Sequence, residues 1–352
     1  PDLPSIVRLD RMVTDVTFRR LDQALGALQQ DEKGERARFL DVLFGERDVT
    51  PVATIEPPQW FDTSLDDSQR RAIAAALTAD PVAMIHGPPG TGKTTALVEL
   101  IRQAVARGDR VLACAPSNVA VDNLAERLAR AGLAVVRLGH PARVHPDVRD
   151  VSLAQQVADA PEQKLLKDAK KDLDQALRRL HKAKSRGDRA AARAELRQLR
   201  AERRQLEQAI TIGLLDRAEV VLATTTGASE AGRGDRAFGM VVVDEAAQAM
   251  EAACWIPLQH ASRLVLAGDH CQLPPTILDA DAARQGLART MFERLSEQPG
   301  TAAMRCMLTV QYRMHDKIMG WSSQTFYGGE LRAADAVREH RLDQLEGVAT
   351  TE

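Results

Sequence analysis

The 352-residue sequence has few of the features that mark secreted, zinc-binding or membrane proteins. Its four cysteines are widely spaced and form no C-x-x-C pair, which argues against a zinc site and against a disulfide framework. A reducing compartment fits this pattern, and we expect a cytoplasmic protein. No apolar run approaches the roughly 18 residues of a membrane-spanning helix, and no signal peptide is visible, so we expect no membrane partner.

An overall basic charge, which would indicate nucleic-acid binding, is also absent, because the formal net charge is only −2. The charge is uneven, however: residues 161–210 contain 15 Lys and Arg against 8 Asp and Glu. Leucines and alanines at helical spacing on both sides of Gly187 predict a helical hairpin. We expect most of its charges to form a solvated face, with a phosphate-tracking surface as the alternative. Because apolar strands resume beyond it, the hairpin is interpreted as an insertion over residues 150–212.

What the sequence does contain is a phosphate-binding motif. Residues 87–94 read G-P-P-G-T-G-K-T, which matches the pattern G-x-x-x-x-G-K-[ST]. An apolar strand at 82–86 and a helix after the motif disfavour the alternative, a glycine-rich turn with an incidental lysine. Loop N–H groups and the helix N-terminus would hold an anion, Lys93 would reach the β and γ phosphates of ATP, and the Thr94 hydroxyl would hold Mg²⁺. The predicted nucleotide-binding residues of this segment are Gly87, Pro88, Pro89, Gly90, Thr91, Gly92, Lys93, Thr94 and Thr95.

Four further apolar stretches predict strands, and each ends in polar residues. They lie at residues 110–115, 219–223, 239–243 and 263–267, and helical segments alternate with them. This alternation predicts an α/β fold with a parallel sheet and helices on both faces. Because ligands bind at the carboxyl ends of the strands in open α/β sheets, the polar residues that follow these strands are the candidate site.

Two adjacent acids follow the strand at 239–243. Asp244 is predicted to bind Mg²⁺, and Glu245 to polarise the attacking water as general base. The alternative, acids that merely favour a helix N-terminus, is disfavoured because a phosphate-binding motif is present in the same chain. After the next strand, Gln272 is predicted to bond the γ phosphate or the attacking water. Asp269 and His270 are expected to fix this loop, and His86 to be a packed strand residue.

Five other polar positions are weaker candidates. The amide of Gln69 could read the adenine edge, although spacing alone favours a solvated surface glutamine. Ser117 and Asn118 could hold a nucleic-acid phosphate, with simple helix capping by Ser117 equally favoured. Arg313 could approach the γ phosphate and Tyr312 could stack on adenine, the alternatives being a surface arginine and a core tyrosine.

The ordered set of motifs resembles superfamily 1 helicases of the up-frameshift type, most closely the immunoglobulin-mu-binding-protein-2-like ATP-dependent helicases. The motifs are S-Q at 68–69, GPPGTGKTT at 87–95, CAPSNVAVDNL at 114–124, ATTTGAS at 223–229, DEAAQ at 244–248, GDHCQLPPT at 268–276 and LTVQYRMH at 308–315. The resemblance implies a RecA-like P-loop NTPase domain over residues 51–304, with N-terminal stalk helices over 1–50 and the helical insertion within the motor domain. It further implies 5′ to 3′ unwinding of RNA or DNA.

The same resemblance assigns roles to individual residues. Gln69 would contact adenine, Tyr312 would lie near the base, and Lys93 and Arg313 would contact the β and γ phosphates. Asp244 and Glu245 would be the metal and water acids, and Gln272 would couple the nucleotide state to nucleic acid. The positions implied to touch single-stranded nucleic acid are Ser117, Asn118 and Thr225.

The chain departs from the family pattern after the last motif. Only 37 residues follow His315, so residues 305–352 are expected to be the start of an incomplete second RecA-like domain, and the chain is expected to be a monomeric fragment. Translocation needs two domains that close and open around ATP, so we expect the chain alone to bind ATP but to hydrolyse and unwind weakly or not at all. The alternative is a nucleotide-gated module that binds single-stranded nucleic acid without unwinding. A GTPase or kinase is disfavoured because no N-K-x-D motif occurs.

Overall fold

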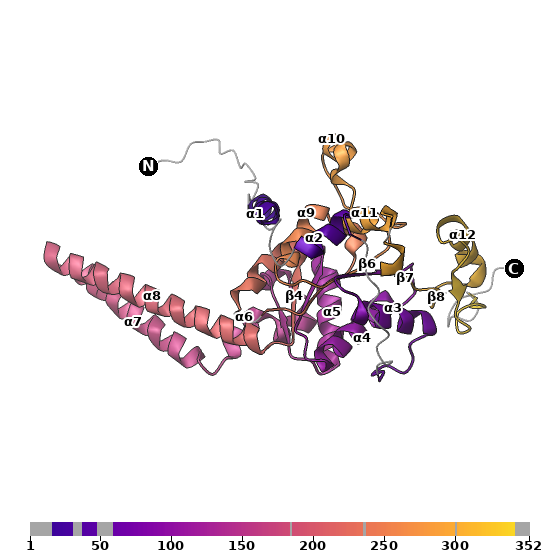
Figure 1. Ribbon diagram of the computed structural model, residues 1–352. Coiled ribbons are helices and arrows are strands. Elements are labelled where there is room, and N and C mark those ends of the chain that lie inside the picture. Colours follow the sequence, from indigo (N-terminus) through magenta and orange to yellow (C-terminus); the bar gives the residue numbers. More distant parts are fainter. Residues whose placement is uncertain are drawn as a thin grey trace, which may run out of the picture.

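A computed structural model describes residues 16–30, 37–47, 59–183, 185–234, 237–299 and 301–341. Its centre is a seven-stranded, fully parallel sheet with the strand order β3-β4-β2-β5-β6-β1-β7 (Figure 1). The strands are β1 (Val82–His86), β2 (Val111–Ala115), β3 (Val135–Arg137), β4 (Val220–Thr224), β5 (Met240–Val243), β6 (Leu264–Gly268) and β7 (Arg305–Met307). The predicted parallel α/β sheet is therefore confirmed.

The central strands are short runs of valine, leucine, alanine and similar residues, and both faces of each strand are covered. Strands β1, β2 and β6 are buried along their whole length. Such runs are typical of parallel strands between two helical layers. The five predicted strands match observed ones to within one residue at each end. Strand β3 was not predicted, because its three residues, of which two are apolar, give too little pattern to detect.

Helices cover both faces of the sheet. One face carries α3 (Asp67–Thr78), α4 (Lys93–Ala106) and α5 (Asn118–Arg130), whose apolar residues share one core with the strands. The other carries α1 (Val16–Gln30), α2 (Ala37–Phe44), α9 (Glu251–Leu258), α11 (Met291–Glu297) and the 3-10 segment η3 (Thr225–Arg233). In Figure 1 the second set lies above the sheet and the first set below it.

The two predicted N-terminal helices belong to this second layer. Helices α1 and α2 lie within residues 1–50, where N-terminal stalk helices were expected, and residues 1–15, 31–36 and 48–50 lie outside the described part of the chain. Ala24 of α1 and Phe39 and Leu43 of α2 are buried in the same core as the strands. These helices are therefore fastened to the sheet body by apolar packing.

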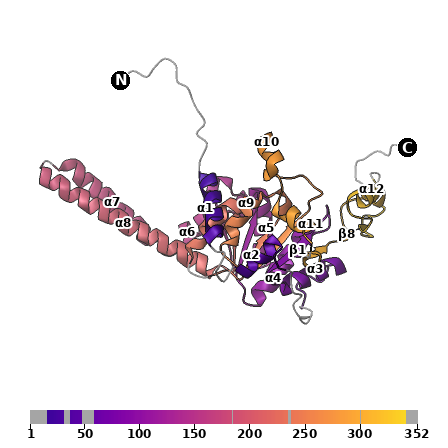
Figure 2. The ribbon, with the colours of Figure 1, turned by 45° about the horizontal axis from the view of Figure 1, so that its top comes forward.

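The predicted helical hairpin is present and projects from the body in both views (Figures 1 and 2). It consists of α7 (Gln163–Lys182) and α8 (Arg186–Arg217), preceded by the short α6 (Leu153–Asp159). Gly187 lies exposed in the first turn of α8, directly after the bend. Two small apolar clusters, one around Leu166 and Ile210 and one around Leu173 and Leu196, hold the two helices together.

The chain beyond β7 forms a small second unit. Strands β8 (Val310–Gln311) and β9 (Arg332–Ala333) pair in parallel, and α12 (Asp316–Phe326) connects them. The predicted boundary at 304/305 needs correction, because β7 pairs with β1 in the main sheet and Leu308 is buried in that core.

The remaining short elements are η1 (Pro141–Arg143), η2 (Pro146–Val151), η4 (Ala246–Gln248), α10 (Ala280–Ala282), the π-helix η5 (Ala283–Leu287) and η6 (Ala302–Met304). None of the described helices combines the length and apolar character needed to cross a bilayer.

Candidate active site

The phosphate-binding motif forms a loop between β1 and α4, at the carboxyl edge of the sheet. Gly90 and Gly92 have φ values of 80° and 72°, a left-handed conformation that side chains rarely adopt. A Cβ atom at Gly92 would lie 2.5 Å from Nε2 of Gln69, and one at Gly87 would lie 2.9 Å from Cβ of Lys93. The glycines are therefore required by the backbone path and by close packing, and they leave loop N–H groups free to face an anion.

Lys93, the first residue of α4, pairs with both predicted acids. Its Nζ lies 3.0 Å from Oδ1 of Asp244 and 2.6 Å from Oε1 of Glu245. Burial by itself would lower the pKa of Lys93, but the two neighbouring carboxylates outweigh it, and the pKa is raised. The side chain therefore stays protonated, and a single cation joins the motif loop to the acids at the end of β5.

The backbone at the two acids is held in an unusual conformation. Asp244 donates its N–H to the carbonyl of Cys114 on the neighbouring strand, at 2.7 Å, and accepts the N–H of Glu245 at 2.8 Å. Glu245 has a φ of 52° and is the only non-glycine residue with positive φ among the described residues. A strained residue held by its surroundings is typical of a functional site. Asp244 is buried while the Glu245 side chain is about one-third exposed, so the second acid faces the ligand.

A cleft of about 570 Å³ lies over these groups. It brings together most of the predicted site residues, from the loop after β1, the start of α4, the turn after β5, the loop after β6 and the segment after β8. Asp244 is not among the lining residues but pairs with Lys93, which is. Its lining residues are Gly87, Pro88, Pro89, Gly90, Thr91, Gly92, Lys93, Thr94, Thr95, Arg127, Glu245, Gln272, Tyr312 and Arg313.

Arg127 is the lining residue that the sequence interpretation missed. It lies on α5, and its Nη1 donates to Oγ1 of Thr95 at 3.3 Å. No motif distinguishes this arginine from the other basic residues of α5; only the packing of α5 beside α4 brings it to the cleft.

Gln69 lies under the motif loop. The interpretation as a solvated surface glutamine is wrong, because the residue is only 4% exposed. Its Oε1 accepts the N–H of Asp66 at 3.1 Å, and its Nε2 donates to the carbonyl of Thr91 at 3.0 Å. The amide therefore completes the cap of α3 and braces the phosphate loop. Its implied contact with adenine stays a prediction.

Tyr312 and Arg313 follow β8 and fold back against the same loop. The N–H of Tyr312 donates to the carbonyl of Gly90 at 2.8 Å, and its hydroxyl donates to Asp66 at 3.0 Å. Burial and this bond raise the pKa of Tyr312 to about 12. Tyr312 is 45% exposed, so the alternative of a core tyrosine is wrong. Both side chains line the cleft from the second unit, where Arg313 remains exposed.

Gln272 reaches the cleft from the loop after β6 and is held by Asp269. Its Nε2 donates to Oδ2 of Asp269 at 2.7 Å. Asp269 is buried and also accepts from Nε2 of His86, at 3.0 Å, and from the N–H of Cys271, at 3.1 Å. Burial raises the pKa of Asp269, but the bonds from His86, Gln272 and Tyr327 outweigh it, and the pKa is lowered. Asp269 thus fixes the loop and His86 packs in β1, as expected.

The same neighbourhood contains a group of potential metal ligands. The donor atoms of His86, Asp269, His270 and Cys271 lie within 4.8 Å of one another. Because both oxygens of Asp269 already accept hydrogen bonds, a metal ion would have to displace protein donors there. The oxygen donors that suit Mg²⁺ are instead the Thr94 hydroxyl at the cleft and the carboxylates of Asp244 and Glu245 beside Lys93.

The predicted nucleic-acid residues lie on adjacent strand ends, because β2 pairs with β4. Ser117 is exposed, and its Oγ accepts the N–H of Ala120, so it caps α5. Asn118 is half-buried and accepts from Nη2 of Arg137 at 2.9 Å. Thr225 is only 3% exposed, so in this conformation of the protein its hydroxyl is not accessible to a strand of nucleic acid. The sequence pattern placed these residues at the carboxyl edge of the sheet but could not tell buried from exposed hydroxyls there.

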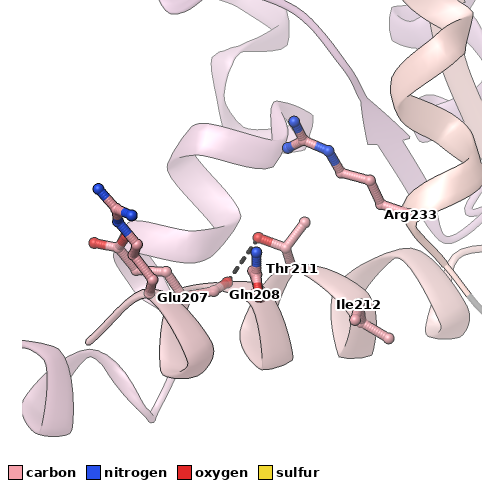
Figure 3. A pocket seen from close by; sticks show the side chains of 6 residues that line it. Glu207, Gln208, Thr211, Ile212 and Arg233 are labelled. Atoms are coloured by element: carbon pink, nitrogen blue, oxygen red, sulfur yellow. Dashed lines mark hydrogen bonds between the residues drawn. The ribbon is translucent and has the colours of Figure 1, made fainter. Parts of the chain in front are cut away.

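A second cavity, of about 520 Å³, lies at the base of the hairpin (Figure 3). Glu207, Gln208 and Thr211 follow one another along α8, and Arg233 reaches toward them from the end of η3. No residue lines both this cavity and the cleft over the phosphate loop. The cavity is therefore separate from the candidate active site.

Comparison with known proteins places these features in a family. Two AAA domain profiles match the chain, one over residues 64–280 and the other over residues 287–352. DNA-binding protein SMUBP-2 of Mesocricetus auratus is 46% identical over the whole chain, which covers 36% of that relative. DNA polymerase alpha-associated DNA helicase A of Schizosaccharomyces pombe is 35% identical over the whole chain, covering 53% of the relative. A Regulator of nonsense transcripts 1 homolog of Arabidopsis thaliana is 32% identical over 96% of the chain, covering 26% of the relative. The chain thus spans only part of the length of its relatives.

Proposed function

We propose that this chain, which belongs to the AAA domain family and to the superfamily 1 helicases of the up-frameshift type, binds and hydrolyses ATP with Mg²⁺. It would supply the nucleotide-driven part of a nucleic-acid helicase. The relatives are named as a DNA-binding protein, a DNA helicase and a regulator of nonsense transcripts. We extend from those names to a single-stranded RNA or DNA partner for this chain.

One observation carries the proposal: Lys93 lies within ion-pair distance of both Asp244 and Glu245, under a cleft whose floor is a glycine loop at a helix N-terminus. When ATP binds, the ammonium group of Lys93 would turn from Asp244 and Glu245 to the β and γ phosphates, and would so exchange one set of anionic partners for another. The move frees two carboxylates beside the phosphates, where a divalent cation and a water molecule need anionic partners.

The donor set at the cleft fits Mg²⁺. Magnesium prefers oxygen ligands, and the residues that would hold it are Thr94, whose side chain lines the cleft, and Asp244, whose carboxylate lies beside Lys93. When bound with ATP, the ion neutralises charge that develops on the phosphates.

The remaining cleft residues have separate roles in the proposed reaction. Glu245 accepts a proton from the attacking water, which its exposed position at the cleft permits. Gln272 orients that water or the γ phosphate, and Arg313 supplies positive charge from the second unit. Because Arg313 lies beyond β8, its position depends on how the second unit sits on the sheet body.

A second candidate for the chain by itself is nucleotide-gated binding of single-stranded nucleic acid without unwinding. The described residues contain a single seven-stranded sheet, and the unit after β7 is small. Unwinding by alternating closure needs two bodies of comparable size around the nucleotide. We therefore expect the isolated chain to bind ATP and to turn it over weakly.

The test measures ATP hydrolysis by the 352-residue chain, with and without single-stranded RNA or DNA, beside the Glu245→Gln variant. Strand-stimulated turnover that disappears in Glu245→Gln supports the complete helicase chemistry. Bound ATP without turnover in either protein supports the gated module. Failure of the wild-type chain to bind ATP–Mg²⁺ at all would exclude both.

A further inference from the structure

The carboxylate of Asp269 joins three parts of the molecule that are far apart in the sequence. Its Oδ1 accepts from His86 at the end of β1 and from the backbone of Cys271. Its Oδ2 accepts from Gln272, which lines the cleft, and from the hydroxyl of Tyr327, which directly follows α12. The carboxylate is 2% exposed, so these donors, rather than water, satisfy its charge.

The two donors on Oδ2 come from different parts of the chain. Nε2 of Gln272 lies 2.7 Å away and the Tyr327 hydroxyl lies 2.8 Å away. A carboxylate oxygen has two lone pairs, and both are used here. When one donor leaves, the remaining hydrogen bond to the ionised oxygen strengthens because it is no longer shared. The hold of Asp269 on Tyr327 therefore depends on where Gln272 points.

Oδ1, by contrast, is held by the sheet body. His86 lies on β1, directly before the phosphate loop, and its carbonyl accepts the N–H of Leu308 at 2.8 Å. The His86 ring lies 5.9 Å from the Tyr327 ring, centroid to centroid. These contacts keep Asp269 in place when Gln272 moves, so a change on Oδ2 passes to Tyr327 rather than being absorbed by rotation of the carboxylate.

On the far side, Tyr327 is part of the core of the second unit. Its ring is buried with Met319 and Leu331, and its backbone N–H donates to Ser323 of α12 at 3.0 Å. Among the described residues, the buried side-chain hydrogen bond that connects this apolar cluster with the loop after β6 is the bond from Tyr327 to Asp269. Strengthening or weakening it changes how firmly α12 is held on the sheet body.

We propose that Asp269 is a positioning residue that carries the state of the nucleotide cleft to α12 through Tyr327. This inference rests on the proposed ATP-binding function. Binding of a nucleoside triphosphate draws the Gln272 amide toward the γ phosphate, Oδ2 keeps Tyr327 as its only side-chain donor, and α12 is held more tightly. Nucleotide binding is therefore expected to stabilise, and not to weaken, the packing of the second unit on the sheet body.

The experiment compares amide hydrogen exchange in α12 with and without ATPγS–Mg²⁺, in the wild-type chain and in Tyr327→Phe. The variant keeps the packed ring and removes only the hydroxyl that donates to Asp269. In the wild type, nucleotide slows exchange in α12 by roughly three- to fivefold, because it strengthens a hydrogen bond to a charged group that is already present. In Tyr327→Phe the ratio falls below about twofold, while nucleotide affinity, measured with a fluorescent ATP analogue, changes by less than about threefold.

Ser323→Ala is the matched control. Ser323 lies on α12 beside this cluster, and among the described residues its hydroxyl bonds with the backbone of Leu331 alone. The control accelerates exchange in both states and keeps the ratio. The proposal is overturned if Tyr327→Phe keeps the full ratio, if Ser323→Ala loses it equally, or if nucleotide binds the wild type without slowing exchange in α12. Absence of nucleotide binding in the wild type overturns the proposed function as well, so the two failures are distinguishable.

Discussion

The carboxyl edge of the sheet and the α7–α8 hairpin both contain many charged residues, but they use them in opposite ways. At the edge, Asp244 and Asp269 are buried and the Lys93 side chain is only 11% exposed, and all three are paired at 3.0 Å or less. On the hairpin, the ion pairs lie at the surface; in the pair Arg179–Glu195, for example, the arginine side chain is 59% exposed and the glutamate side chain 39%. Exposed pairs contribute about 0–1 kcal/mol to stability, whereas a buried charge without its partner costs several. The hairpin has the larger net charge, yet the few charges at the edge mark the site.

The largest effect is expected where a buried charge at the edge loses its partner. Arg137 is 1% exposed, and its Nε donates to Asp122 at 2.8 Å while Nη2 donates to Asn118. Arg137→Met leaves Asp122 buried and short of a donor, so we expect the free energy of unfolding in urea to fall by about 3–5 kcal/mol. A loss below about 1 kcal/mol would place this pair with the exposed hairpin pairs and break the contrast.

The next effect concerns the nucleotide. Lys93→Ala removes the only cation that pairs with Asp244 and Glu245 among the described residues, and leaves two carboxylates facing the phosphates. We expect ATP–Mg²⁺ affinity to fall by at least about 100-fold, or about 2.7 kcal/mol, in a fluorescent-nucleotide titration. Arg130→Ala, which removes a pair with Glu126 on the surface of α5, serves as the control and leaves the affinity unchanged. Equal effects of the two changes would contradict the assigned role of Lys93.

A smaller effect concerns pH. Because the pKa of Asp269 is lowered in the folded protein, its carboxylate stabilises the fold at pH values above its ordinary pKa of 3.8. That contribution is lost as the pH falls from 3.8 through the lower folded-state pKa. We expect the difference in unfolding free energy between wild type and Asp269→Asn to be constant from pH 7 to about pH 5 and to shrink below 3.8. A difference that grows on acidification would show that the sign is wrong.

The smallest effect is expected on the hairpin. Arg179→Ala removes an exposed ion pair with Glu195 that links α7 to α8. We expect a change in unfolding free energy of less than about 0.5 kcal/mol, and no change in ATP affinity. The salt dependence of binding to single-stranded DNA sharpens this prediction, because a phosphate contact would reduce the slope of log K against log salt concentration by about 0.7. An unchanged slope favours the solvated face over the phosphate-tracking alternative.

Much of the fold was predictable because its signals are local. Strands β1, β2, β4, β5 and β6 are apolar runs of four or five residues bounded by polar turns, and such runs are detectable without a partner. Strand β3 was missed because it has only three residues, and β7 was assigned to the wrong unit because pairing with β1 is a long-range event.

Four features could be predicted from the sequence, because each depends on residue types at short spacing: the phosphate loop, the acids after β5, the loop after β6 and the helical hairpin. Packing between elements, by contrast, buries Gln69 under the loop, hides Thr225 and brings Arg127 to the cleft. Packing also brings the Tyr327 hydroxyl to the Asp269 oxygen that Gln272 contacts, although Tyr327 lies 58 positions after Asp269 in the sequence. Burial and partnership depend on which elements pack together, and spacing along the chain does not encode this directly.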